Sequence, residues 1–164
     1  MLFDLSTALR TTYVVAVGSN RPGRHGGPRA EVAAALDRLD GLASPTLMTP
    51  PLGPSSRTFA NAVALVRSER SPPEMLAWLK RIEADFGRRS GRRWGARVID
   101  LDLILWSGGA WSSPGLTIPH VAYRQRTFVL APLAAIAPNW RDPLTARSVR
   151  HLLALLTRRR RARR

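Results

Sequence analysis

The stretch RVIDLDLILW, residues 97–106, places two aspartates in a mostly apolar run. Side chains of a β-strand alternate between its two faces, so an extended conformation puts Asp100 and Asp102 on the same face. On this alternation their face also carries Ile104 and Trp106, and the other face carries Ile99, Leu101, Leu103 and Leu105. The pattern predicts a half-buried strand with two neighbouring carboxylates.

The two carboxylates need a positive partner, because apolar neighbours on their face disfavour full solvation of both charges. Mg²⁺ accepts one or two protein carboxylates and completes its coordination shell with water and substrate phosphate. Two simpler interpretations are a strand end that rises into water and ion pairs with Arg93 and Arg97 just upstream. The strand alone leaves these alternatives open.

The segments around this strand predict an α+β domain. Residues 13–17 and 59–66 are typical of strands, and residues 30–41 are typical of a helix. Ser71, two prolines and Glu74 form a helix-start signature for a second helix that ends at Gly87. Residues 107–111 predict a hairpin turn, and two more helices follow within 127–138 and 146–156. This order fits a ferredoxin-like split βαβ sandwich, a mostly antiparallel sheet with helices on one face.

Length and composition predict one domain. The chain has 164 residues, 45% of them hydrophobic, and no cysteine, which excludes disulfides and thiolate metal sites. The first residues lack the basic start and apolar core of a secretion signal, so we expect a cytoplasmic protein, and we expect it to be a monomer. Residues 1–157 are predicted to form the domain and residues 158–164 a basic, disordered tail.

The formal net charge is +15, and all but one of the 26 basic residues are arginine. A phosphorylated small molecule and a nucleic acid are both suitable partners for such a chain. An RNA-binding module is therefore one alternative, although two carboxylates on the binding face would repel phosphate. Another metal-dependent nucleotide enzyme, such as a nucleotidyltransferase, is a second. Several arginines between residues 88 and 97 stand close to the aspartates and favour a metal–triphosphate site.

Several blocks of sequence, in order, resemble the 6-hydroxymethyl-7,8-dihydropterin pyrophosphokinase family. The blocks lie between Tyr13 and Pro138 and read VGSN, TPPLGP, FANAV, RIEADFGR, RRWGARVIDLDLILW, LTIPH and RQRTFVLAPLAAIAP. The resemblance implies transfer of pyrophosphate from ATP to the hydroxymethyl group of the pterin, a step of folate biosynthesis that leaves AMP. It also implies two Mg²⁺ ions as cofactors, no membrane and no specific nucleic acid.

The resemblance assigns roles to individual positions. Asp100 and Asp102 would be the metal ligands, and Arg88 and Arg97 would join them as catalytic residues. The implied pterin-binding residues are Thr49, Pro50, Leu52, Phe59, Asn61 and Phe128. The implied ATP-binding residues are Glu83, Arg93, Trp94, Thr117, His120 and Arg126. The sequence departs from the family at Val121, where many members carry tyrosine, and at Ala96, where proline is usual.

Overall fold

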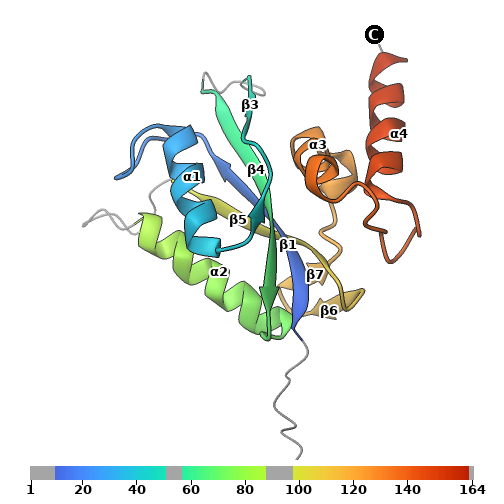
Figure 1. Ribbon diagram of the computed structural model, residues 1–164, viewed down its shortest axis with the longest axis horizontal. Coiled ribbons are helices and arrows are strands. Elements are labelled where there is room, and N and C mark those ends of the chain that lie inside the picture. The colour runs from blue at the N-terminus through green and yellow to red at the C-terminus, as the bar shows by residue number, and fades with distance from the viewer. Residues whose placement is uncertain (1–9, 51–56, 88–97, 163–164) are drawn as a thin grey trace, which may run out of the picture.

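A five-stranded antiparallel sheet forms the centre of the computed structural model (Figure 1). Its central strand β1 (Thr11–Ser19) pairs with β4 (Phe59–Ser68) on one side and with β5 (Asp100–Trp106) on the other. Two short strands, β2 (Leu42–Ala43) and β3 (Leu47–Thr49), pair with the far edge of β4. The structure describes residues 10–50, 57–87 and 98–162.

Helices cover both faces of this sheet. α1 (Pro28–Leu39) and α2 (Pro72–Gly87) pack on one face, where Val15, Val17 and Leu101 are buried. α3 (Thr127–Ile136) lies over the other face, and α4 (Val149–Arg161) packs beside α3 (Figure 1). The predicted α+β class and antiparallel sheet are confirmed. The prediction of helices on one face was wrong, because β1 and β4 are apolar on both faces and each face requires cover.

A β-bulge in β5 changes which face its last residues occupy. Val15 pairs with Leu103 and Val14 pairs with Leu105, so Ile104 is an extra residue between two paired positions. Leu105 therefore joins Ile104 in the core under α3, and Trp106 packs on the α1 and α2 side. The predicted alternation holds through Ile104 and is wrong for Leu105 and Trp106.

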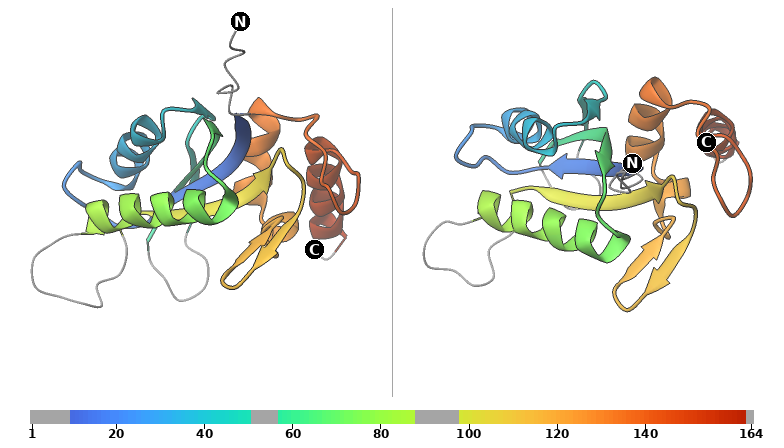
Figure 2. Two further views of the ribbon diagram at one scale, coloured as in Figure 1. Left: turned by 90° about the horizontal axis from the view of Figure 1, so that it is seen from below. Right: turned by 60° about the horizontal axis from the view of Figure 1, so that its bottom comes forward.

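The predicted element boundaries are largely confirmed. Glu74 accepts hydrogen bonds from the backbone N–H and the hydroxyl of Ser71, both at 2.8 Å, so half of the expected capping box forms at the start of α2. α1 begins at Pro28, two residues earlier than expected, because proline suits the first turn of a helix. After β5, a hairpin of β6 (Trp111–Ser113) and β7 (Leu116–Ile118) projects from the sheet (Figure 2) and leads to the 3₁₀ turn η1 (Tyr123–Gln125).

The C-terminal helix includes part of the predicted tail. α4 extends through residues 158–161, which we had expected to be disordered. Arginine is a good helix former, and positive charge in the last turn complements the helix dipole, so these residues continue the helix. Within the described part of the chain, no helix is long and apolar enough to span a membrane.

Candidate active site

Two small residues of β1 leave room for a cavity on the face that α3 covers. Ala16 lies opposite Asp102 in the register, and Gly18 lies between Asn61 of β4 and Asp100 of β5. A Cβ atom at Gly18 would come within 3.3 Å of Asn61 Oδ1, so a side chain here would press on that amide. The space above these small residues is a cavity of about 410 Å³.

The cavity brings together seven of the predicted site residues from four elements. Strand β3 supplies one of them, β4 two, β5 two, and α3 together with the residue just before it two. They are Thr49, Phe59, Asn61, Asp100, Asp102, Arg126 and Phe128. These residues are as much as 79 positions apart in sequence (128 − 49), and the sheet and α3 bring them to one site.

One aromatic ring and the amide lie on β4, and the second aromatic ring lies on α3. Phe59 and Asn61 are two residues apart on β4 and both line the cavity, as strand alternation predicts. Asn61 Nδ2 donates to Thr49 Oγ1 at 3.1 Å, which orients the mostly buried amide. Phe128 lines the same cavity from α3. A cavity with two aromatic rings and an oriented amide suits a flat, polar heterocycle.

The two carboxylates lie beside a cation at the cavity. Arg126 Nη1 lies 3.4 Å from Asp102 Oδ2, and its guanidinium carbon lies 5.8 Å from the centre of the Phe128 ring. The Asp102 side chain is 42% exposed and Asp100 is exposed, so both can reach a ligand from solvent. Two carboxylates on one face, open to water, fit Mg²⁺, which keeps part of its shell for water and phosphate.

His120 lies just after β7, and the charges of Asp102 and Arg126 both act on its ring. Its Nδ1 accepts a hydrogen bond from the Ala122 N–H at 3.1 Å, so in the neutral ring the proton is on Nε2. Burial lowers the pKa of His120, the charge of Asp102 opposes this shift, and the charge of Arg126 adds to it. Burial is the largest of the three effects, so the balance favours the neutral ring.

The other predicted residues lie elsewhere or outside the described chain. Glu83, predicted for ATP, is not among the residues that line the cavity; its carboxylate accepts hydrogen bonds from the Leu101 N–H at 2.7 Å and from Lys80 Nζ at 2.9 Å. Because β5 is an edge strand, this carboxylate satisfies a backbone donor between the two aspartates. Pro50 and Thr117 are exposed and not among the residues that line the cavity. Leu52, Arg88, Arg93, Trp94 and Arg97 lie outside the described residues.

Sequence reasoning missed part of the cavity wall. Ser19 and Asn20 line it at the end of β1, and Val129 lines it from α3. The run GSN directly after a β-rich segment was a usable signal, because polar residues at a strand end commonly contribute to sites. The Arg126–Asp102 ion pair had no local signal.

A family model described as 7,8-dihydro-6-hydroxymethylpterin-pyrophosphokinase (HPPK) matches residues 14–138. The chain belongs to this family. Among HPPK relatives, the Pseudomonas aeruginosa 2-amino-4-hydroxy-6-hydroxymethyldihydropteridine pyrophosphokinase is 38% identical over 150 residues, 87% of this chain and 88% of its own. The Synechocystis protein of the same name is 42% identical over 101 residues, 62% of this chain and 52% of its own.

Solved structures support the fold assignment. The Plasmodium falciparum HPPK-DHPS structure superposes with a TM-score of 0.73 and 13% sequence identity, covering 94% of this chain and 46% of that one. At this identity the likeness concerns the fold, which is ferredoxin-like α+β, as predicted. The chain spans about half the length of the Synechocystis relative and of the Plasmodium chain.

Proposed function

We propose that this chain transfers the β- and γ-phosphates of ATP, as one pyrophosphoryl group, to 6-hydroxymethyl-7,8-dihydropterin in folate biosynthesis. The hydroxymethyl oxygen bonds to the β-phosphorus and loses its proton, and the bond from that phosphorus to the α,β-bridging oxygen breaks. The products are the pterin diphosphate and AMP. The observation that carries the proposal is that one cavity combines Phe59, Asn61 and Phe128 with the Asp100–Asp102 pair.

The pterin would occupy the part of the cavity between β4 and α3. Phe59 and Phe128 would stack on its two faces, which excludes water from the ring. Asn61, oriented by Thr49 at 3.1 Å, would present its amide to the polar edge of the ring. Pro50 and Leu52, which come one and three positions after Thr49 in the sequence, are proposed as further pterin contacts.

Asp100 and Asp102 would hold two Mg²⁺ ions in this proposal. When bound, Mg²⁺ would neutralise part of the negative charge of the phosphates. Arg126, which pairs with Asp102 at 3.4 Å in this structure, can turn its guanidinium group to a phosphate oxygen at the same place. The neutral His120 ring has a donor at Nε2 that can hydrogen-bond to the nucleotide.

The remaining nucleotide contacts stay predictions that rest on the family resemblance. They are Glu83, Arg93, Trp94 and Thr117 for ATP, and Arg88 and Arg97 as catalytic groups. Arginines suit this task because each guanidinium group can take two phosphate oxygens at once. Glu83 would act through the edge of β5, where its carboxylate accepts the Leu101 N–H.

The test is incubation of the purified chain with ATP, Mg²⁺ and 6-hydroxymethyl-7,8-dihydropterin, with products identified by mass spectrometry. We expect AMP and the pterin diphosphate in equal amounts, and neither product when excess EDTA removes the metal. Release of inorganic pyrophosphate with AMP joined to the pterin would indicate a nucleotidyltransferase instead. RNA binding that weakens with salt, together with no ATP turnover, would favour the RNA-binding alternative.

A further inference from the structure

Tyr123, in η1, connects two residues that we propose for the nucleotide. Its backbone N–H donates to the His120 carbonyl at 3.2 Å, and its own carbonyl accepts from the Arg126 N–H at 3.1 Å. His120 and Arg126 are each three positions from Tyr123, one on either side. The position of Tyr123 therefore helps to fix the backbone positions of His120 and Arg126.

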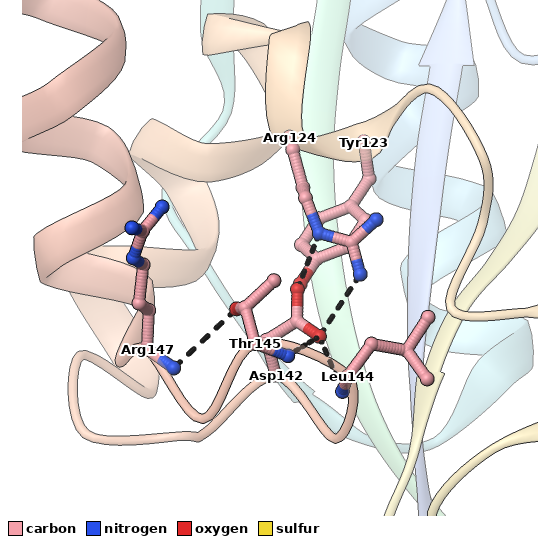
Figure 3. Close-up of polar contacts among 6 residues, drawn as sticks. All are labelled: Tyr123, Arg124, Asp142, Leu144, Thr145 and Arg147. Atoms are coloured by element: carbon pink, nitrogen blue, oxygen red, sulfur yellow. Dashed lines mark hydrogen bonds and ion pairs between the residues drawn. The ribbon is translucent and has the colours of Figure 1, made fainter.

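A buried carboxylate holds the side chain of Tyr123. The ring is fully buried in the core under α3 and α4, and its hydroxyl donates to Asp142 Oδ2 at 2.6 Å (Figure 3). The neighbouring Arg124 forms a two-pronged ion pair with the same carboxylate, with Nη2 at 2.9 Å from Oδ1 and Nε on Oδ2. Asp142 thus binds two consecutive residues of the turn that joins His120 to Arg126.

Asp142 is itself held by its loop. Its side chain is fully buried, and Oδ1 accepts the N–H groups of Leu144 at 2.8 Å and Thr145 at 3.2 Å (Figure 3). Its backbone N–H donates to the Arg147 carbonyl at 2.9 Å. A buried charge with this many donors is rigid, and removing it leaves those donors without their acceptor. The residue lies beyond residues 14–138, which match the family model.

We propose that Asp142 is a positioning residue for the nucleotide site, acting through Tyr123 and Arg124 on His120 and Arg126. The inference rests on the proposed function, since it assumes that these two residues face ATP. Arg126 Nη1 lies 3.4 Å from Asp102 Oδ2, so a small shift of η1 moves its guanidinium group relative to the carboxylates. Displacements of about 1 Å at such a group can reduce turnover by roughly 100-fold.

If Asp142 and Tyr123 had a purely structural role, their substitution would lower stability without changing nucleotide affinity. A second buried tyrosine of the chain provides a matched control for the loss of stability. Tyr13 is also a fully buried tyrosine, and its hydroxyl donates to the Arg70 carbonyl at 2.5 Å. It lies in β1 three residues before Ala16, the first β1 residue that lines the cavity. Tyr13→Phe therefore removes a comparable buried hydrogen bond that has no link to η1.

The experiment compares Tyr123→Phe, Asp142→Asn and Tyr13→Phe with the wild type. We measure the melting temperature, the KM values for ATP and for the pterin, and the Kd of a non-hydrolysable ATP analogue with Mg²⁺. We expect all three variants to melt at lower temperature. Only Tyr123→Phe and Asp142→Asn should raise the KM for ATP and the Kd of the analogue, by roughly tenfold, with little change in the KM for the pterin.

If the folded Tyr123→Phe protein binds the nucleotide analogue as tightly as the wild type, the inference is overturned. If Asp142→Asn does not fold, the Tyr123→Phe result is sufficient to test the inference. Equal weakening of nucleotide affinity by Tyr13→Phe would also overturn it. A wild type that binds the analogue and forms no AMP refutes the proposed reaction, while the binding comparison still judges the positioning role. A wild type that binds no nucleotide overturns both.

Discussion

Asp102 lies between two positive partners, namely Arg126 in this structure and the Mg²⁺ that we propose it shares with Asp100. The Arg126 side chain is 34% exposed and the Asp102 side chain is 42% exposed, so water screens the ion pair between them. Pairs of this kind contribute at most about 1 kcal/mol to folding. The carboxylate is therefore placed for binding more than for stability.

The first prediction concerns these carboxylates. Asp100→Asn and Asp102→Asn should each lower kcat/KM by at least about 100-fold, because each removes a charge on which the metal depends. Melting temperature should change little, since loss of one of two neighbouring like charges offsets the lost ion pair. Asp85→Asn is the control, because Asp85 is 43% exposed and pairs with Arg38 at 3.7 Å on the other face of the sheet. Near-normal activity in both cavity variants would refute the metal assignment.

The second prediction concerns Phe128, which lines the cavity and is partly buried. Phe128→Ala should weaken pterin binding by about 1–3 kcal/mol, the range found for bases stacked on aromatic side chains, and should affect nucleotide binding less. Equilibrium titration with each ligand measures both effects. Equal weakening of both ligands, or a lower melting temperature with unchanged pterin affinity, would make Phe128 a structural residue.

At the level of elements, the loop between β1 and α1 is held by one buried carboxylate. Glu31, in the first turn of α1, is fully buried and bonds to the His25 backbone N–H at 2.6 Å and to His25 Nδ1 at 2.9 Å. The same carboxylate leaves no room at Gly23, where a Cβ atom would lie 2.6 Å from Glu31 Oε1. This loop begins next to Asn20, which lines the cavity.

The third prediction follows from this anchor. Glu31→Gln keeps the size of the side chain but turns one acceptor into a donor, and we expect it to lower the free energy of unfolding by about 1–3 kcal/mol. Urea unfolding measures the change. Glu69→Gln is the control, because Glu69 pairs with Arg10 at 3.3 Å on the surface. This substitution should lower the free energy of unfolding by no more than about 0.5 kcal/mol. Equal effects of the two substitutions would show that Glu31 does not anchor the loop.

At the level of the whole molecule, stability in acid depends on Asp142, which lies between α3 and α4 in the chain and bonds to Tyr123 and Arg124 of η1. Burial raises the pKa of Asp142, but hydrogen bonds from Arg124, Tyr123 and the Leu144 N–H outweigh it and hold the pKa well below its usual range. A carboxyl group with a lowered pKa in the folded state stabilises the protein above its unfolded pKa. That contribution disappears as the pH falls toward the folded value.

The fourth prediction uses this sign. The free energy of unfolding should decrease as the pH is lowered below about 4, the pKa of an unfolded aspartate. Asp142→Asn should lack this part of the pH dependence, so the stability difference between wild type and variant should be large at pH 6 and should shrink toward pH 2. Urea unfolding across this range measures it. A difference that stays constant with pH would show that Asp142 does not supply the charge-dependent stability.

Local patterns in the sequence were sufficient for several features of this protein. Strand alternation placed Asp100 with Asp102 and Phe59 with Asn61, and a capping signature located the start of α2, because these depend on residues only a few positions apart. The ordered sequence blocks identified the family from Tyr13 to Pro138. The α+β class also followed from the order of strands and helices.

Only the tertiary structure decided which distant groups meet. The bulge at Ile104 arises from the register between β1 and β5, and it moved Leu105 and Trp106 to faces that alternation could not predict. Asp102 meets Arg126 from 24 positions away, and Tyr123 meets Asp142 from 19 positions away. Such contacts form when apolar faces pack and bring chain segments together, and no local periodicity encodes which polar side chains then become neighbours.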